Sequence, residues 1–420
     1  MTMRPDHWHD GADHARVLAA AKEDHESVLE LTRALVRVPS RAGIDTHDPI
    51  IDLLYGWMRK HDLPVDIVRD TIGAAVGLVA EVCGTHPGPR WVLDACLDSA
   101  PFGDENAWTH PPTSGLTGNG WLWGRGSSDS KVAVAIFCHL AIRLAAVADQ
   151  LHGTIVLLFD LDEHTGGFGG AKQYFEGPNA PSDVAGVMIG YPGMDKLVIG
   201  GRGVYRTQLH VHGTSSHSGG SKATPNAIEK AAHLIRELST AELPDGASDD
   251  FPLQGKLTVT AATGGQGYSV TPDLCTINVD IRTTPTFDDI AAAALLEGTV
   301  AEVDYAWDDT QPTLIEVTTR WPAFALPTDS PLRATMIDAA HAFGIDVEPK
   351  IAGPSNIGNY LAGLGIPATA GFGVTYTGLH ATDERFRTDT VPTVQAIYHA
   401  ALLRLLGQQQ DDPPGTVHHS

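Results

Sequence analysis

The chain has 420 residues, which predicts roughly two or three domains, because a single hydrophobic core seldom extends beyond ~250–300 residues. Its composition, with 42% hydrophobic and 19% charged residues, is that of an ordinary globular protein. The formal net charge of -23 argues against nucleic acids and anionic membrane surfaces as partners, because both are negatively charged. We therefore expect a small-molecule substrate.

Cysteine spacing and hydropathy favour a protein of the reducing cytoplasm. The four cysteines lie far apart and include no C-x-x-C pair, which argues against a disulfide framework and a structural zinc knuckle. Residues 1–14 lack the apolar stretch of a signal peptide, and no segment approaches the ~20 apolar residues that span a bilayer. We expect a cytoplasmic location and no membrane partner.

Buried strands alternate with helices in the first half of the chain. The earliest element is an amphipathic helix over Glu23–Val38, where Val28, Leu31 and Leu35 recur at helical spacing before Pro39. The next expected elements are a strand at 91–95, a helix at 130–151, a strand at 154–160, a short helix at 170–175 and a strand at 185–190. Strands that alternate with helices in this way predict an α/β fold with a mostly parallel sheet.

The pattern changes near Arg202, where the strands begin to alternate apolar and polar residues. The expected elements here are strands at 204–213, 256–262, 275–282 and 313–319, an amphipathic helix at 224–238 and a second helix from Phe287. The sequence therefore predicts an inserted α+β domain over residues 203–322. Helices near 331–343, 355–363 and 389–406 then resume the crossover pattern. Residues 1–202 and 323–420 would form the two parts of the α/β domain.

Acidic, histidine or tyrosine side chains directly follow three of the predicted parallel strands. The stretches are CLDSAP at 96–101, DLDEHTGG at 160–167 and GYPG at 190–193. Because ligands of open α/β sheets bind at the carboxyl ends of the strands, we expect these stretches to converge. Two further loops carry candidates, since Asp129 lies in GRGSSDSK and His380 lies in GLHATDE.

Each of these candidates also has an ordinary structural explanation. Asp129 could be a helix N-cap, His380 a surface or core histidine, and Glu163 and His164 a solvated pair. The order and spacing of the motifs are more specific. The informative stretches are LDSAP, WTHPP, GLTGNGWLWGRGSSDSK, DEHTGGFGGA, GRGVYRTQLHVHGTSSHS, NAIEKAAHLI, VDIRTTP, GPSNIGNYLAGLGIPATAGFG and HATDE.

Together these motifs resemble the M20 family of metallopeptidases and amidohydrolases. That family includes succinyl-diaminopimelate desuccinylases, acetylornithine deacetylases, aminoacylases and glutamate carboxypeptidases. The resemblance extends over nearly the whole chain, the inserted domain included. It implies a zinc-exopeptidase-like catalytic domain formed by residues 1–202 and 323–420, and a lid or dimerisation domain at 203–322 that makes the enzyme a homodimer.

The resemblance also implies a metal site, but one with altered ligands. In the family, two zinc ions share one aspartate, which corresponds to Asp129 here. The other ligands of the second ion correspond to His164, where the family usually has glutamate, and to His380. Both private ligands of the first ion have changed, because Cys96 replaces the histidine of a His-x-Asp-x-x-Pro motif and Tyr191 replaces an acid before a proline.

Three interpretations of these changes stay open. Cys96 could be a substitute ligand in a surviving dinuclear site, since thiolates bind zinc well. The chain could instead have lost metal and become a metal-free binding protein. The interpretation that we favour is one divalent ion per chain, held by Asp129, His164 and His380, because two imidazoles and one carboxylate leave a coordination position for water. The expected ion is Zn²⁺, and the same ligands also suit manganese, cobalt or iron.

The resemblance assigns catalytic roles to three further residues. Glu163 matches the general base of the family, and His217 matches a lid histidine that reaches into the partner subunit's active site to stabilise the oxyanion. Asp98 matches the aspartate that orients the first metal's histidine; because Cys96 replaces that histidine, we expect Asp98 to hydrogen-bond to groups around the metal ligands or to substrate. A cis peptide follows the shared aspartate in the family and is therefore expected between Asp129 and Ser130.

Substrate recognition is expected to involve arginines. Arg282 and Arg202 match positions that can engage a substrate carboxylate, and Asn356 is expected to line the same cleft. The sequence therefore predicts a metal-dependent hydrolase that cleaves the amide bond of an N-acyl amino acid or short peptide. The alternatives are a repurposed enzyme of this fold that forms or transfers an amide or acyl group, and the metal-free binding protein.

Overall fold

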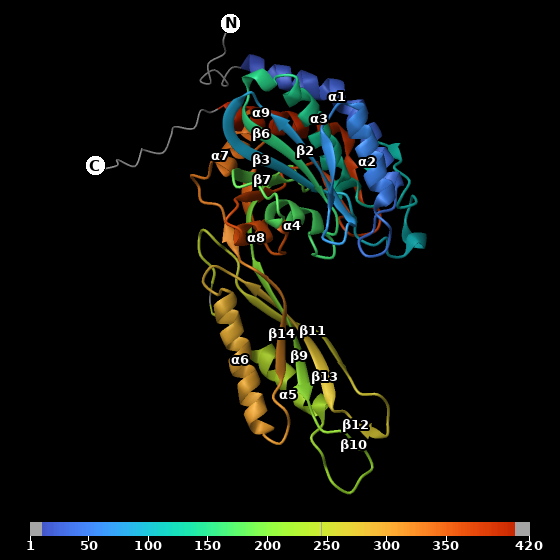
Figure 1. Cartoon of the computed structure of the whole chain (residues 1–420), viewed down its shortest axis with the longest axis vertical. Helices are drawn as coiled ribbons and strands as arrows, with labels where there is room; N and C mark the ends of the chain where they lie inside the picture. The colour runs from blue at the N-terminus through green and yellow to red at the C-terminus, as the bar shows by residue number, and fades with distance from the viewer. Residues whose placement is uncertain (1–10, 245, 408–420) are drawn as a thin grey trace, which may run out of the picture. The chain divides into compact units, whose positions relative to one another are not determined.

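The structure, a computed structural model, describes residues 11–244 and 246–407. The chain divides into two compact units, each with its own strands and helices (Figure 1). Unit 1 comprises Met1–Ile199, Leu326–Lys350 and Ile366–Ser420, and unit 2 comprises Gly200–Ala325 and Ile351–Gly365.

One segment belongs to a different unit from the one that the sequence suggested. Residues 323–420 were all expected in the α/β domain, but residues 351–365 pack within unit 2. The buried side chain of Asn359 gives the physical reason. Its amide nitrogen donates hydrogen bonds to the carbonyl oxygens of Arg202 at 3.1 Å and Pro322 at 2.8 Å, which attach this segment to unit 2.

Unit 1 is built around a mixed β-sheet with the strand order β1-β2-β6-β3-β7-β17-β8 (Figure 1). These strands are β1 (Val65–Arg69), β2 (Ala75–Cys83), β3 (His86–Cys96), β6 (His152–Asp160), β7 (Val184–Ile189), β8 (Lys196–Gly201) and β17 (Ala368–Ala370). The four central strands, β6, β3, β7 and β17, run parallel to one another. The β1/β2, β2/β6 and β17/β8 pairs are antiparallel. The α/β fold is confirmed, whereas the parallel part of the sheet is limited to these four strands.

The antiparallel edge begins with a hairpin that the sequence pattern did not identify. The amide of Asp70 donates to the carbonyl oxygen of Ala74 at 2.9 Å, and Gly73 has a φ of 87°, in the left-handed region. So short a connection can join only antiparallel strands, whereas parallel neighbours need a long crossover. Strands β1 and β2 are therefore antiparallel for a local reason.

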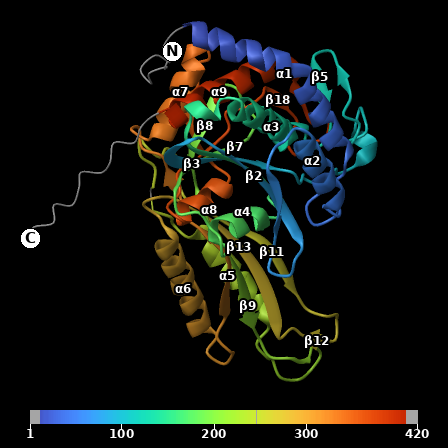
Figure 2. The ribbon, with the colours of Figure 1, turned by 45° about the horizontal axis from the view of Figure 1, so that its top comes forward.

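The buried faces of unit 1 agree with the apolar patterns. Val92 and Leu93 on β3 are completely buried, as strands covered on both faces should be. The helices are α1 (Gly11–Arg37), α2 (Asp48–Lys60), α3 (Val132–Ala145), α4 (Gly169–Glu176), α7 (Pro331–Ala342) and α9 (Val391–Gly407). Helices α1, α3 and α9 pack on one another, and α4 contacts β2 and β6 (Figure 2). Helix α1 begins at Gly11 rather than Glu23.

Unit 2 is an α+β layer with an antiparallel sheet in the order β11-β13-β9-β14. The elements are β9 (Gly203–His212), β10 (Ser216–His217), α5 (Ala227–Thr240), β11 (Lys256–Gly264), β12 (Val270–Thr271), β13 (Leu274–Thr283), α6 (Asp289–Ala306), β14 (Leu314–Trp321), β15 (Phe324–Ala325), β16 (Glu348–Ala352, which spans the boundary of the units) and α8 (Ile357–Gly363). Alternate residues of β9 and β13, among them Leu209, Ile277 and Val279, form a core with α5 and α6. The other face of the sheet is left to polar side chains.

Two further observations concern cysteines and membrane spans. All four cysteines are free thiols; Cys83 is exposed and the other three are buried. Within residues 11–244 and 246–407, none of the helices combines the length and the apolar character that crossing a bilayer requires.

Candidate metal centre

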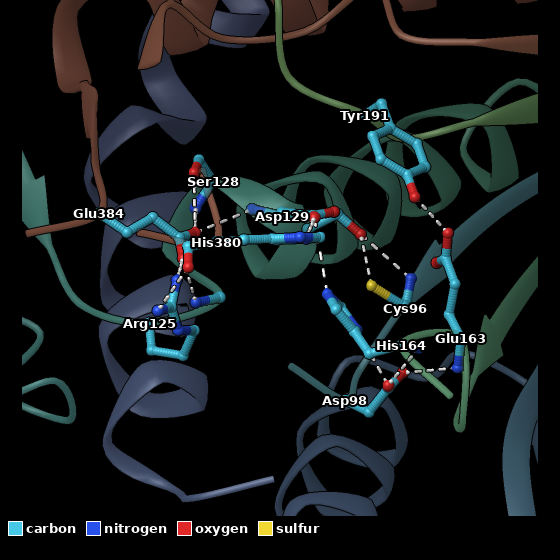
Figure 3. Close-up of polar contacts among 12 residues, drawn as sticks. Cys96, Asp98, Arg125, Ser128, Asp129, Glu163, His164, Tyr191, His380 and Glu384 are labelled. Atoms are coloured by element: carbon cyan, nitrogen blue, oxygen red, sulfur yellow. Dashed lines mark hydrogen bonds and ion pairs between the residues drawn. The ribbon is translucent and has the colours of Figure 1, made fainter. Parts of the chain in front are cut away.

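Three loops of unit 1 bring Asp129, His164 and His380 together (Figure 3). His380 Nε2 lies 2.8 Å from Asp129 Oδ2, and His164 Nε2 lies 3.6 Å from the same oxygen. One possible ligand atom from each of the three residues lies within 4.8 Å of the other two. This arrangement is compact enough for a single cation to contact all three.

A small sheet explains why loops 250 residues apart in sequence meet at this point. Its strands are β18 (Tyr376–Thr377), β19 (Arg385–Arg387), β5 (Trp121–Trp123) and β4 (Thr117–Gly118). Arg385 pairs with Trp123, and its guanidinium lies 4.1 Å from the centre of the Trp123 ring. Strand β5 leads directly into the loop of Asp129, and the loop of His380 leads directly into β19. Pairing of these strands therefore fixes the two loops side by side.

The donor set suits a divalent cation. Burial raises the pKa of the Asp129 carboxyl, but hydrogen bonds from His164 and His380 outweigh it and lower the pKa to about 2. Asp129 Oδ1 is also buried and receives no hydrogen bond from the described residues. A buried carboxylate with an unpaired oxygen is costly unless a cation compensates its charge. The two imidazoles supply the remaining ligands of a two-histidine, one-carboxylate set.

Asp98 positions His164. Its carboxylate accepts hydrogen bonds from the amide of Glu163 at 3.2 Å and from the amide of His164 at 3.0 Å. It also lies 3.0 Å from His164 Nδ1. Burial lowers the pKa of His164, but the contacts with Asp129 and Asp98 raise it to about 11. With Nδ1 on Asp98, Nε2 faces Asp129, which is the orientation that a metal-binding imidazole needs.

Glu163 is paired with Tyr191, a contact that sequence reasoning missed. The Tyr191 hydroxyl donates to Glu163 Oε1 at 2.5 Å (Figure 3). Burial, followed by the charge of Asp129, raises the pKa of Glu163 to about 7. Sequence reasoning treated Tyr191 only as a poor substitute for a metal ligand. Its position directly after β7, at the carboxyl end of a central strand, was the available signal.

Cys96 ends β3 and lies next to Ser130, close to His164. Its Sγ is 3.4 Å from Ser130 Oγ, and burial raises the pKa of the thiol. Cys96, Asp98 and His164 form a second group whose possible ligand atoms lie within 4.8 Å of one another. The peptide bond between Asp129 and Ser130 is cis, as expected.

The other four expected site residues belong to unit 2. His217 is exposed on β10, and its Nδ1 accepts a hydrogen bond from the Gly219 amide at 3.0 Å. Asn356 is the N-cap of α8, where its side-chain oxygen accepts from the Gly358 amide at 2.8 Å. The expected cleft-lining residue therefore has a structural role in the helix. No described contact joins His217 to Asn356.

The two arginines make different contacts. Arg202 donates through Nε to the carbonyl oxygen of Gly353 at 3.0 Å, so this guanidinium nitrogen is already bound to the backbone. Arg282 donates through Nε to Asp280 at 2.7 Å and through Nη1 to Ser355 at 3.1 Å. Arg282 also lines a hollow of about 360 Å³ on the polar face of the unit 2 sheet, together with Arg206, Thr207, Gln208, Thr260, Asn278, Val279, Asp280 and Thr318.

Comparisons with known proteins identify the family of the chain. The model of Peptidase family M20/M25/M40 matches residues 93–404. A succinyl-diaminopimelate desuccinylase of Paracoccus denitrificans is 31% identical over 206 residues, which are 48% of this chain and about half, 53%, of the relative. Another, from Stenotrophomonas maltophilia, is 27% identical over 398 residues, which are 90% of this chain and 99% of the relative.

A solved structure supports the fold. The YXEP protein of Bacillus subtilis, described as a dinuclear metal-binding peptidase of the M20 family, superimposes with a TM-score of 0.68 at 16% identity. The match covers 92% of this chain and 99% of that protein. The family model covers far more than half of the sequence, from Leu93 in β3 to Arg404 in α9. This chain therefore belongs to Peptidase family M20/M25/M40 and is an enzyme of the metallopeptidase and amidohydrolase type.

Proposed function

We propose that this enzyme hydrolyses the amide bond of an N-acyl amino acid or short peptide with one divalent ion per chain, expected to be Zn²⁺. Asp129, His164 and His380 would hold the ion. The observation that carries the proposal is that both imidazoles lie against one buried carboxylate, at 2.8 and 3.6 Å, while its other oxygen has no partner among the described residues. A cation would replace the protons that the imidazoles now share with Asp129.

The neighbouring side of the site favours one ion over two. Burial raises the pKa of the Cys96 thiol, and burial and the charge of Glu163 raise the pKa of the Tyr191 phenol, so each group resists losing the proton that a metal ion would have to displace. Protonated thiols and phenols are poor ligands, since the metal binds the thiolate. The Tyr191 hydroxyl moreover already donates a hydrogen bond to Glu163. A dinuclear site would require a deprotonated thiol at Cys96 and a side chain at Tyr191 that is not already engaged with Glu163.

A bound ion would polarise the scissile carbonyl group and lower the pKa of its water. Glu163 would take the proton of the attacking water and pass it to the leaving nitrogen. Because Tyr191 holds Oε1 of Glu163, we assign the proton transfer to Oε2. Asp98 would keep His164 in one tautomer and one orientation. In this proposal the chain is a homodimer, and His217 of the lid donates a hydrogen bond to the oxyanion.

Arg282 is the residue that we propose for the substrate carboxylate. Its guanidinium is held by Asp280 and Ser355 and lines the polar hollow of unit 2. A planar guanidinium can donate two parallel hydrogen bonds to a carboxylate. Arg202 would support it, although two of its nitrogens already donate to the backbone carbonyl oxygens of Gly353 and Gln254. The relatives named as succinyl-diaminopimelate desuccinylases support a substrate of the N-acyl amino acid class.

The test combines metal counting with an activity screen. Purified protein should contain about one ion per chain by elemental analysis, and two ions would restore the dinuclear alternative. A panel of N-acyl amino acids and dipeptides should then include a substrate whose hydrolysis stops on chelation and returns with Zn²⁺. A protein without metal and without hydrolysis would favour the binding protein. Amide formation from the same acids and amines without net hydrolysis would favour the repurposed enzyme.

A further inference from the structure

Glu384 joins the loops that carry two of the proposed metal ligands. Its side chain is 1% exposed and lies four residues beyond His380 in the same loop. The carboxylate accepts five hydrogen bonds from the segment 125–129, which ends at Asp129 (Figure 3). The donors are Arg125 Nη1 at 2.8 Å, the Gly126 amide at 3.0 Å, the Ser128 amide at 3.1 Å, the Ser128 hydroxyl at 2.8 Å and the Asp129 amide at 3.3 Å.

Arg125 completes the connection in the opposite direction. Besides its ion pair with Glu384, it donates through Nη2 to the carbonyl oxygen of His380 at 3.2 Å and through Nε to that of Pro101 at 3.1 Å. His380 has a φ of 57°, in the left-handed region that non-glycine residues avoid. The bond from Arg125 to its carbonyl holds the histidine in this unfavourable backbone conformation.

We propose that Glu384 and Arg125 are positioning residues that fix Asp129 relative to His380 for metal binding. The inference rests on the proposed metal site, and it concerns residues that do not touch the ion. Because the pair is internally neutral, it adds no charge that would compete with Asp129 for the cation. A buried ion pair stabilises a fold poorly compared with apolar residues, since both charges lose their hydration. The hydrogen bonds of the pair reach the loops that carry Asp129 and His380, so we assign the pair the role of holding these two loops in place.

The test is Glu384→Gln, which keeps the shape of the side chain but places an amide opposite Arg125 and the Gly126 amide. Metal-free protein would be titrated with Zn²⁺ and with Co²⁺. We expect the dissociation constant to rise by about tenfold or more, as is typical when a group that orients a ligand is removed. The visible absorption of the Co²⁺ protein should also change, because the ligands would meet the ion at altered angles.

Lys230→Met provides the matched control. Lys230 is completely buried in unit 2, where it pairs with Asp304 at 2.7 Å, so its loss also breaks a buried ion pair. This variant should lose thermal stability yet keep the wild-type affinity for Co²⁺ and the wild-type spectrum. An equal loss of affinity in Lys230→Met and Glu384→Gln would overturn the proposal, because general destabilisation would then account for both.

A gentler variant covers the case in which Glu384→Gln does not fold. Ser128→Ala removes one hydroxyl donor from Glu384 and leaves no charge unpaired. It should shift the Co²⁺ spectrum and raise the dissociation constant by roughly threefold. If the wild-type binds one ion while Ser128→Ala and any folded Glu384→Gln protein match it in affinity and spectrum, this inference fails alone. If the wild-type binds no ion, the proposed function fails and this inference fails with it.

Discussion

The site has two sides that meet at His164, and they differ in chemistry. Asp129 and His380 form the first side, and Cys96 and Tyr191 form the second. On one side, Asp129 is ionised, buried and short of partners, and His380 faces it at 2.8 Å. On the other side, Cys96 and Tyr191 carry protons and already have polar neighbours in Ser130 and Glu163. A cation would gain from the first environment, whereas in the second the carboxylate of Asp98 is already engaged by His164 and by the amide of Glu163. We therefore propose that the side chains at Cys96 and Tyr191, more than the shape of the fold, limit this site to one ion.

The largest expected effect comes from removing the charge of Asp129, which distinguishes the first side from the second. Asp129→Asn should abolish metal binding and lower kcat/KM by about 10³-fold or more, because a bound ion contributes several kcal/mol to transition-state stabilisation. Cys96→Ala, the matched change on the second side, should leave the metal content unchanged. Elemental analysis and a hydrolysis assay of both variants check this. A Cys96→Ala protein that loses its metal would reverse the assignment of the two sides.

Glu163 should separate catalysis from metal binding. Glu163→Gln should lower kcat by about 10²- to 10⁴-fold, the usual range for a lost general base, and leave the number of bound ions unchanged. The amide can still accept the hydrogen bond from Tyr191, so the local packing is kept. Activity that stays within a few-fold of the wild-type, with metal present, would show that another group takes the proton.

The second side can also be given metal ligands of the kind that the first side has. Cys96→His combined with Tyr191→Glu would supply an imidazole and a carboxylate where the chain now has a thiol and a phenol. Metal content should rise from about one to about two ions per chain, since two new ligands would join Asp129. Each single variant should stay near one ion, because a lone added ligand leaves the second position incomplete. A double variant that still holds one ion would show that something other than the side chains at Cys96 and Tyr191 limits the number of ions.

The features that strand ends determine were predictable from the sequence. Residues that follow the carboxyl ends of parallel strands must meet at one edge of the sheet, so His164 could be expected near Tyr191 without a structure. The hairpin of β1 and β2 was not predicted, because β1 has only five residues and both strands are only partly buried. The packing of residues 351–365 with unit 2 depends on hydrogen bonds of Asn359, Ser355 and Gly353 to distant parts of the chain, which no pattern reveals.

The pairing of side chains within the site was beyond the reach of sequence reasoning. Asp98 was expected to hydrogen-bond around the metal ligands or to substrate, but its partner could not be named, because Cys96 replaces the histidine that it orients in the family. In the structure it turns to His164 instead, across a distance of 66 residues in sequence. The contact between Tyr191 and Glu163 likewise depends on rotamers and on strand register. Spacing shows which groups can meet, but the partner that each one chooses is decided by three-dimensional packing.

Tyr191→Phe is the finest test of the comparison, because it removes one hydroxyl and no ligand of the proposed ion. The hydrogen bond from Tyr191 lowers the pKa of Glu163, so its loss should raise that pKa. A base must be deprotonated to act, and the acidic limb of the kcat/KM profile should therefore move to higher pH. At neutral pH we expect kcat to fall by about tenfold, which is the effect of one hydrogen bond to a charged group. The metal content should not change, and a loss of the ion would identify the phenol as a ligand after all. Tyr398→Phe controls for loss of a buried tyrosine hydroxyl, since that group donates to the Phe372 carbonyl oxygen at 2.7 Å and touches none of the proposed ligands. It should lower thermal stability and leave the pH profile where it is.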